Sequence, residues 1–394
     1  MTTLIEPSTT TAPPGIDFSL TEDQELLRAE VRRFAEERVR PGAAERDRQH
    51  TFPVEIFKEM AEMGLFGMLV PEEYGGIDAD TLSYLLVIEE LARVDAAVPV
   101  TMSVTSSVCC WPIVKFGSEA LKRKVLPPLA SGETLGGFGL TEPSAGSDAG
   151  SLKTTAWRDG DFWVLNGEKA WITNAGYAGW FVVVARTNPE AGKRGLSAIV
   201  VPADAPGFSV GQPEEKLGLR SSRTAQIYFS DCRVPYENLL GEEGQGLKIA
   251  LATLAHSRLG IAAQAVGIHQ RALELAVEYA KDRVQFGVPI AQHQAIQFKI
   301  AQIATDLAAS RALTWYAAAA EHTPQAGRLA AQAKVYASEA ANRACWESLQ
   351  IHGGNGFHED YEISRLYRDV RVTTIYEGTS EMQRMVIARD LLRQ

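Results

Sequence analysis

Two short segments in the middle of the chain combine side chains that can bind a flat ring. Residues 138–148 read FGLTEPSAGSD, a loop whose small residues let backbone amides and hydroxyls approach a ligand closely. Trp171 and Thr173 lie on a predicted strand, where an aromatic plane beside a hydroxyl can flank a ring and hydrogen-bond its edge. Each segment also has a purely structural interpretation, as an ordinary turn and as a tryptophan packed in a sheet.

A carboxylate near the C-terminus is the candidate for proton transfer. Glu377 lies in the segment IYEGTSEMQR (375–384), where Ser380 and Gln383 have the spacing of a capping box and predict a helix start just after the glutamate. A carboxylate at such a place commonly only complements the helix dipole. Under a bound ligand, burial would raise its pKa while the dipole lowers it, and the balance can suit the group for proton removal.

Signatures of several enzyme classes do not occur in the sequence. There is no Walker A loop, HExxH helix or strand-borne GxGxxG, which argues against nicotinamide-dependent and nucleotide-hydrolysing enzymes. The seven histidines are scattered without metal-ligand spacing, and the four cysteines form no CxxC pair. We therefore expect no metal site.

The elements that must position these residues follow an unusual order. Helical periodicity runs through the first third, short β-branched and aromatic runs separated by turns begin near Ser131, and alanine-rich helical segments follow Gly246. The pattern predicts an α+β chain, mainly α. We expect a mobile tail at residues 1–17, an all-helical domain at 18–130, an antiparallel β domain at 131–245 and a four-helix bundle at 246–394.

Composition restricts the partners. The 394 residues carry a formal charge of −10, which disfavours nucleic acid and anionic membrane as partners. The first 17 residues resemble neither a secretory signal nor a transit peptide, and we find no uninterrupted apolar run near the roughly 20 residues of a membrane helix. With cysteines that suggest no disulfide framework, we expect a cytoplasmic protein without a membrane partner.

Five segments together resemble the acyl-CoA dehydrogenase family. They are LTEPSAGSDAG (140–150), AWITN (170–174), DRVQFG (282–287), QIHGGNGF (350–357) and IYEGTSEMQR (375–384), in the family's order and approximate spacing. The resemblance covers essentially the whole chain after the tail. It implies the acyl-CoA dehydrogenase fold, in which a helical domain, a β domain and a helical bundle follow one another.

The resemblance implies FAD as cofactor and a thioester of coenzyme A as substrate. In the family a carboxylate removes the α-proton, the β-hydrogen leaves as hydride to flavin N5, and the electrons pass to an electron-transferring flavoprotein. Motif matching makes Glu377 the base. Some relatives place the base at the position of Ser257, which here cannot accept the proton at neutral pH. The thioester carbonyl in the family accepts hydrogen bonds from the backbone N–H of the base and from a flavin hydroxyl.

The same matching implies three sets of contacts. Those along the flavin are Phe138, Leu140, Thr141, Trp171, Thr173, Thr379 and Glu381. Those that reach the FAD of a neighbouring subunit are Arg283, Phe286, Gln294, Gln350, Gly353 and Gly354, which implies a homotetramer built as a pair of dimers. The planar, always charged guanidinium of Arg283 suits a pyrophosphate. Those that match substrate contacts are Ser147, Arg258 and Gly378.

The segments MSVTSS (102–107) and HSRLGIAAQAVG (256–267) resemble the short-chain and short-branched-chain members. Glutaryl-CoA dehydrogenases carry an arginine shortly before a similar MSV segment, where this chain has AVPVT (97–101), so a dicarboxylate substrate is disfavoured. Two alternatives stay open. One is a flavin oxidase or monooxygenase on the same fold, and the other is a catalytically inactive relative that acts as a binding scaffold.

Overall fold

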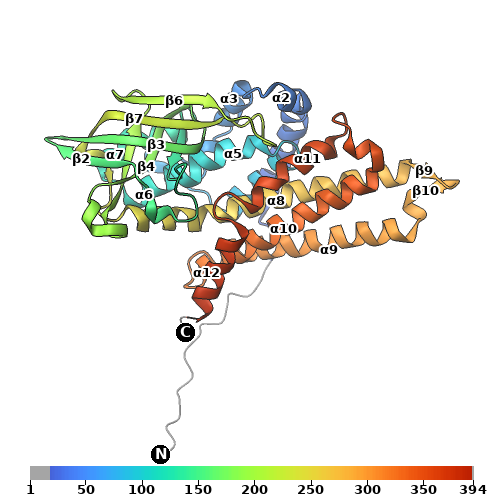
Figure 1. Cartoon of the computed structure of the whole chain (residues 1–394). Coiled ribbons are helices and arrows are strands. Elements are labelled where there is room, and N and C mark those ends of the chain that lie inside the picture. The colour runs from blue at the N-terminus through green and yellow to red at the C-terminus, as the bar shows by residue number, and fades with distance from the viewer. Residues whose placement is uncertain (1–17, 393–394) are drawn as a thin grey trace, which may run out of the picture.

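The computed structural model describes residues 18–392, with helices at both ends of the chain and a sheet between them (Figure 1). The tail expected at residues 1–17 lies outside the described residues. The first helices are α1 (Glu22–Phe34), α2 (Ala43–Gln49), α3 (Val54–Glu62), α4 (Thr81–Ala92), α5 (Ala97–Ser103), α6 (Trp111–Phe116) and α7 (Glu119–Ala130). A complete capping box between Thr21 and Gln24 starts α1.

One helical rod, residues 97–116, connects the helices to the sheet. It consists of α5, a π-helical stretch η4 (Val104–Cys110) and α6, and it is almost wholly buried from 97 to 110. Thr105 Oγ1 accepts a hydrogen bond from the Gly136 N–H at 3.1 Å, and Asn174 Nδ2 donates to the Thr101 carbonyl at 3.1 Å. The rod therefore fixes the sheet segment around residue 174 relative to the helices.

The sheet has the order β6-β7-β3-β2-β4-β5-β8, with β1 paired to β4. Its strands are β1 (Leu135–Gly139), β2 (Thr155–Asp159), β3 (Phe162–Thr173), β4 (Ala178–Arg186), β5 (Leu196–Pro202), β6 (Phe208–Pro213), β7 (Thr224–Pro235) and β8 (Leu239–Leu240). The predicted α+β fold is confirmed, but the sheet is mixed rather than purely antiparallel. The β1 strand runs parallel to β4 because a loop and the β2–β3 hairpin lie between them and return the chain in the same direction.

The last third forms the predicted bundle. Its helices are α8 (Gly246–Asp282), α9 (Gln294–Ala319), α10 (Ala326–His352), α11 (Glu362–Val370) and α12 (Ser380–Leu392), and the short strands β9 (Val284–Gln285) and β10 (Val288–Pro289) join α8 to α9. Small residues permit close packing: a Cβ at Gly267 would lie 2.3 Å from the Glu89 carbonyl oxygen of α4. Figure 1 shows the sheet at one end of α8 and the β9–β10 hairpin at the other.

Two helical stretches, Ala97–Phe116 and Gly246–Asp282, are long and apolar enough to cross a membrane. In their most apolar windows, 83% and 72% of the residues are buried inside the fold. Core helices of soluble proteins meet the same criterion, so these two helices are weak evidence for a membrane location.

Candidate active site

Glu377 lies on a tight turn immediately before α12. Its φ is 53° and that of Gly378 is 89°, so two consecutive residues adopt the left-handed region. A glutamate rarely adopts that conformation, which costs on the order of 1–3 kcal/mol and is found where the surrounding structure enforces it. At Gly378 the absence of a side chain is required as well, because a Cβ would lie 2.7 Å from Gln383 Nε2.

The predicted capping box at this helix start is wrong. The cap is one residue earlier, since the Thr379 hydroxyl accepts from the Met382 N–H at 3.4 Å and the Thr379 carbonyl from the Gln383 N–H at 3.0 Å. The Gln383 side chain points back to the turn instead, and its Nε2 donates to the Glu377 carbonyl at 3.0 Å and to the Gly378 carbonyl at 2.8 Å. The glutamine that sequence spacing assigned to capping therefore holds the turn.

The Glu377 carboxylate meets α8 at Ser257. The Ser257 hydroxyl donates to Glu377 Oε2 at 2.5 Å. Burial raises the pKa of Glu377 above its usual value, while the Ser257 hydrogen bond and the charges of Lys334 and Arg258 oppose the rise. A carboxylate that is raised in pKa but still supported in its ionised form is suited to remove a proton near neutral pH.

Two buried cations lie near this carboxylate. Lys334 of α10 is fully buried and donates from Nζ to the Gly378 carbonyl at 2.7 Å. Arg258 of α8 is 8% exposed, and its Nε has no hydrogen-bond partner within residues 18–392. Burial lowers the pKa of Lys334 to about 8, and Glu377 opposes that shift. Together, Glu377, Lys334 and Arg258 therefore carry more positive than negative charge. This excess would stabilise negative charge that develops on a bound molecule.

Polar groups also extend along α8 beyond the glutamate. The Tyr376 hydroxyl donates to Gln264 Oε1, and Gln264 Nε2 donates to the Ala96 carbonyl at 2.9 Å. Tyr84 of α4 donates to the Ser103 hydroxyl at 3.0 Å, and burial raises the pKa of Tyr84 to about 12. The bonds through Gln264 anchor Tyr376, the residue before the base, to α8 and to the residue that precedes α5.

The loop at residues 138–148 is tied to β3 by a buried ion pair. Lys169 Nζ lies 2.8 Å from Glu142 Oε1 and 3.3 Å from the Leu140 carbonyl, and the Ala170 N–H donates to the Thr141 carbonyl at 2.9 Å. Glu142 also accepts from the backbone N–H of Thr154 at 2.8 Å. The predicted flavin-loop residues Leu140 and Thr141 are thereby held beside the strand that carries Trp171 and Thr173.

Trp171 stands out from β3 instead of packing in the sheet. Its φ is 62°, the β3–β7 pairing shifts register between Lys169 and Ile172, and the side chain is 60% exposed. A bulge of this kind re-aims a side chain. The structural interpretation of Trp171 as a core tryptophan is therefore wrong. Thr173 and Phe138 are half-buried, and Ser147 is exposed in its loop.

The residues expected to reach a neighbouring subunit's cofactor gather at the other end of the bundle. Arg283, Gly353 and Gly354 line one hollow of about 340 Å³, and Phe286, on the β9–β10 hairpin, is 94% exposed. Gln294 and Gln350 are exposed near the facing helix ends. At roughly 1.5 Å per residue, Arg283 lies about 38 Å along α8 from Arg258. Within one chain, the residues at the β9–β10 end of the bundle therefore lie far from Glu377, which precedes α12 (Figure 1).

Comparison with known proteins agrees with this arrangement over the whole length. Three family models match: the acyl-CoA dehydrogenase N-terminal domain at residues 21–133, the middle domain at 137–232 and the C-terminal domain at 244–392. The chain belongs to the acyl-CoA dehydrogenase family. It is 48% identical over 375 residues to the human short-chain specific acyl-CoA dehydrogenase, mitochondrial, covering 95% of this chain and 91% of that protein.

Solved structures of the family are similar too. The butyryl-CoA dehydrogenase from Megasphaera elsdenii superposes with a TM-score of 0.94 at 44% identity, covering 96% of this chain and all of the other. An acyl-CoA dehydrogenase from Bacillus anthracis, complexed with FAD, gives 0.90 at 37% identity, covering 95% and 67%. The fold prediction and the assignment as an enzyme of this family are confirmed, and FAD is the family's cofactor.

The residues of this acyl-CoA dehydrogenase fit FAD. Trp171 and Phe286 are large aromatic side chains left exposed, and no hydrogen bond or ion pair joins the Arg283 guanidinium to another residue in the described part of the chain. The hollow beside Arg283 is lined by glycines whose Cβ positions face open space. A flat ring beside Trp171 and a pyrophosphate beside Arg283 would satisfy these groups.

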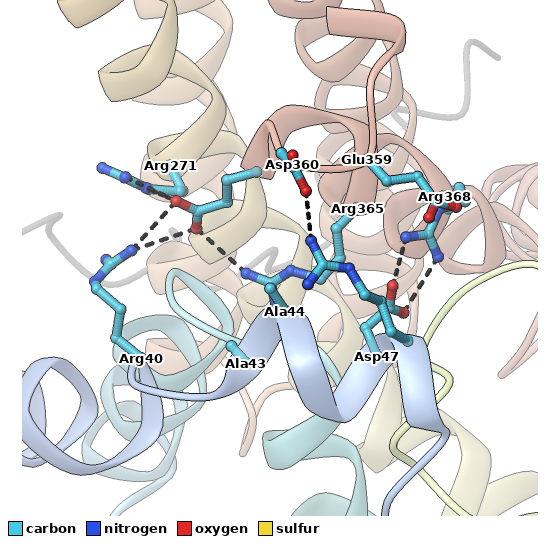
Figure 2. A pocket seen from close by; sticks show the side chains of 11 residues that line it. Arg40, Ala43, Ala44, Asp47, Arg271, Glu359, Asp360, Arg365 and Arg368 are labelled. Atoms are coloured by element: carbon cyan, nitrogen blue, oxygen red, sulfur yellow. Dashed lines mark hydrogen bonds and ion pairs between the residues drawn. The ribbon is translucent and has the colours of Figure 1, made fainter.

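A second hollow, of about 250 Å³, lies between α2, α8 and α11 and is lined by five arginines (Figure 2). Glu362 accepts from Arg40 at 3.3 Å and from Arg271 at 2.8 Å, and Arg368 donates to Asp47 at 2.5 Å. The charged side chains that line this hollow form ion pairs with one another. We therefore interpret the hollow as a place where ion pairs hold the N-terminal helices against the bundle.

The sequence analysis missed two residues that contribute to the site, Lys334 and Lys169, and assigned a third, Gln383, to the wrong role. A signal existed for Lys334, a lone cation in a stretch of α10 that is otherwise alanine and serine on its buried face. Lysine is almost never fully buried without a partner, so such a residue points to a contact. Within the described residues, no group of three or more His, Cys, Asp or Glu could hold a metal ion.

Proposed function

We propose that this protein is an FAD-dependent acyl-CoA dehydrogenase that converts a short or short-branched saturated acyl-CoA to its trans-2-enoyl-CoA, with Glu377 as the base. The observation that carries the proposal is the geometry of Glu377. Glu377 is half-buried, burial raises the pKa of its carboxylate, and Ser257 donates a hydrogen bond to it, on a turn that the structure holds in an unfavourable conformation.

In this reaction the Glu377 carboxylate takes the α-proton of the thioester. Bound FAD supplies the acceptor for the β-hydrogen, which leaves as hydride with its electron pair. The backbone N–H of Glu377 makes no hydrogen bond within residues 18–392, so it is free to donate to the thioester carbonyl. Negative charge on that oxygen is further favoured by the nearby Arg258 and Lys334. Gly378 and Ser147 are the other proposed substrate contacts.

The cofactor site that we propose is shared between two chains. Phe138, Leu140, Thr141, Trp171, Thr173, Thr379 and Glu381 of one subunit line the flavin, while Arg283, Phe286, Gln294, Gln350, Gly353 and Gly354 come from its neighbour. The distance of about 38 Å along α8 between Arg283 and Arg258, which lies near Glu377, supports this division. We propose a homotetramer built as a pair of dimers.

Further parts of the proposal rest on the family resemblance and composition. Electrons would leave to an electron-transferring flavoprotein, and the enzyme would work in the cytoplasm without nucleic acid or membrane as a partner. Its domains would extend over residues 18–130, 131–245 and 246–394. The short-chain preference is supported by the relatives' names, which specify short-chain and butyryl substrates.

Anaerobic titration of the purified yellow protein with a series of saturated acyl-CoA thioesters tests the function. We expect bleaching of the flavin band, fastest with a short or short-branched chain. No bleaching across the series would overturn the proposal and favour the inactive scaffold. Rapid reoxidation of the reduced flavin in air, with product bound, would favour the oxidase alternative.

A further inference from the structure

Lys334 is a fully buried cation whose effect on the geometry of the base goes beyond the charge stabilisation proposed above. It lies on the inner face of α10 among alanines, including Ala330, Ala337 and Ala341. Within residues 18–392, its side chain makes one hydrogen bond, from Nζ to the Gly378 carbonyl at 2.7 Å. A lysine is rarely removed from water for a single backbone contact. The burial of Lys334 therefore indicates that the Gly378 carbonyl needs this hydrogen-bond donor.

The Gly378 carbonyl needs a donor because it belongs to the left-handed turn. Glu377 and Gly378 both have positive φ, and their carbonyls are held by two donors: Gln383 Nε2 bonds both, and Lys334 Nζ bonds the second. Gln383 is itself fully buried and belongs to the helix that follows the turn. Lys334 belongs to a different helix, α10, so it links the Gly378 carbonyl to the bundle in addition to the contacts that Tyr376 and Glu377 make with α8.

We propose that Lys334 is a positioning residue for the base. Its ammonium group holds the Gly378 carbonyl and thereby keeps both the Glu377 carboxylate and the Glu377 backbone N–H directed at the substrate. The inference rests on the proposed role of Glu377 and deepens it. Two functions follow from one side chain: a hydrogen bond that sets geometry, and a positive charge that favours the ionised carboxylate.

The effect of the Lys334 charge on the Glu377 carboxylate can be distinguished from the effects of the other groups that face this carboxylate. From α8 these are Ser257, which donates a hydrogen bond, and Arg258; from α4 and the turn itself they are Tyr84 and Tyr376, whose hydroxyls are neutral at working pH because burial raises the pKa of both. Lys334 in turn faces Arg258, which opposes its charge, and Glu339 and Glu381, which support it. Removing the Lys334 charge leaves Arg258 as the remaining cation acting on Glu377, and the pKa of Glu377 should rise.

The test compares Lys334→Met and Lys334→Gln with the wild-type holoenzyme. Methionine keeps the length of the side chain and removes both functions, whereas glutamine can restore the donor without the charge. Lys248→Met, an exposed lysine near the start of α8, controls for loss of a cation in general. The readouts are kcat, KM, the pH profile of kcat, FAD content and thermal midpoint, with a short saturated acyl-CoA and an artificial electron acceptor.

For Lys334→Met we expect kcat to fall about 10- to 100-fold with KM changed less than about 3-fold, because displacing a catalytic group by about 1 Å can cost 10²-fold. The acid limb of the profile should move up by about one pH unit, the lower end of what an opposite charge does at close range. Lys334→Gln should recover most of the loss in kcat and keep the shifted limb.

Two results would overturn the inference. One is wild-type kcat and an unmoved acid limb in Lys334→Met, with FAD retained, while Glu377→Gln is inactive. The other is a loss of activity that follows loss of FAD or a lower thermal midpoint, with the acid limb unmoved in the fraction that stays folded. If Lys334→Met does not fold, the position of the acid limb in the pH profile of Lys334→Gln decides whether the inference holds. Turnover by Glu377→Gln would instead refute the proposed function itself.

Discussion

Replacing Ser257 by alanine should move the acid limb of the enzyme's pH profile. The Ser257 hydroxyl has two acceptors within reach, Glu377 Oε2 at 2.5 Å and the Leu254 carbonyl at 3.3 Å. A hydroxyl has one proton, and the shorter distance and the charged acceptor both favour the carboxylate. In the wild type this bond supports the ionised form of Glu377, which is the form that can accept the α-proton.

The size of the shift follows from the bond. A hydrogen bond to a charged group contributes about 1.5–3 kcal/mol, and one pKa unit corresponds to about 1.36 kcal/mol. Complete loss would raise the pKa of Glu377 by about 1–2 units. Because Lys334 and Arg258 still favour the carboxylate, we expect the lower value, about one unit. A higher pKa means that a higher pH is needed to ionise the base, so activity at acid pH should drop while the plateau at high pH changes less than about 3-fold.

The assay is steady-state kcat against pH for wild type, Ser257→Ala and Ser257→Thr, which keeps the hydroxyl. Thr253→Ala is the matched control. Thr253 lies one turn earlier on α8, is also buried, and gives its hydroxyl to the Ile249 carbonyl at 2.9 Å rather than to Glu377. Coincident acid limbs for Ser257→Ala and Thr253→Ala would refute the reasoning, and so would a shift of the Ser257→Ala limb to lower pH.

Two further substitutions test the cofactor site and the loop beside it. Arg283→Met should weaken FAD retention about 10- to 100-fold, the loss of about 1.5–3 kcal/mol for a bond to a charged group, measured by titrating apoprotein with FAD; Lys281→Met, an exposed lysine near the end of α8, is the control, and equal affinities would argue against the contact. Lys169→Met should destabilise the protein by about 3–5 kcal/mol, because it leaves Glu142 buried without its cation. Adding Glu142→Gln should recover much of that loss in urea unfolding, and a double variant no more stable than the single would count against the ion pair.

Much of the fold could be predicted because its signals are local. The alanine-rich helical pattern after Gly246 predicted the helical bundle, and the turn-separated β-branched runs predicted the sheet. The parallel pairing of β1 with β4 could not be predicted, because pairing depends on where the chain returns after the β2–β3 hairpin. The exposure of Trp171 depends on a bulge opposite β7, which is likewise a property of two strands together.

The candidate site could likewise be predicted from the sequence only in part. Glu377 could be found by its motif, whereas the separation of Arg283 from Arg258 follows from the observed length of α8. The contacts that adjust the base could not be found in this way. Ser257, Lys334 and Gln383 come from three different helices and meet at Glu377 and Gly378 only through the packing of the bundle. Local spacing even misled at Gln383, since its side chain completes a turn rather than a cap.

The central claim is that Glu377 removes the substrate proton in an FAD-dependent dehydrogenation. The most direct measurement is anaerobic stopped-flow reduction of the flavin by a short saturated acyl-CoA, in wild type and Glu377→Gln at equal FAD content. General-base catalysis contributes about 10²- to 10⁴-fold, so we predict rapid bleaching in the wild type and a rate at least about 100-fold lower in the variant. Bleaching of Glu377→Gln at a rate near that of the wild type, with FAD bound, would contradict the account.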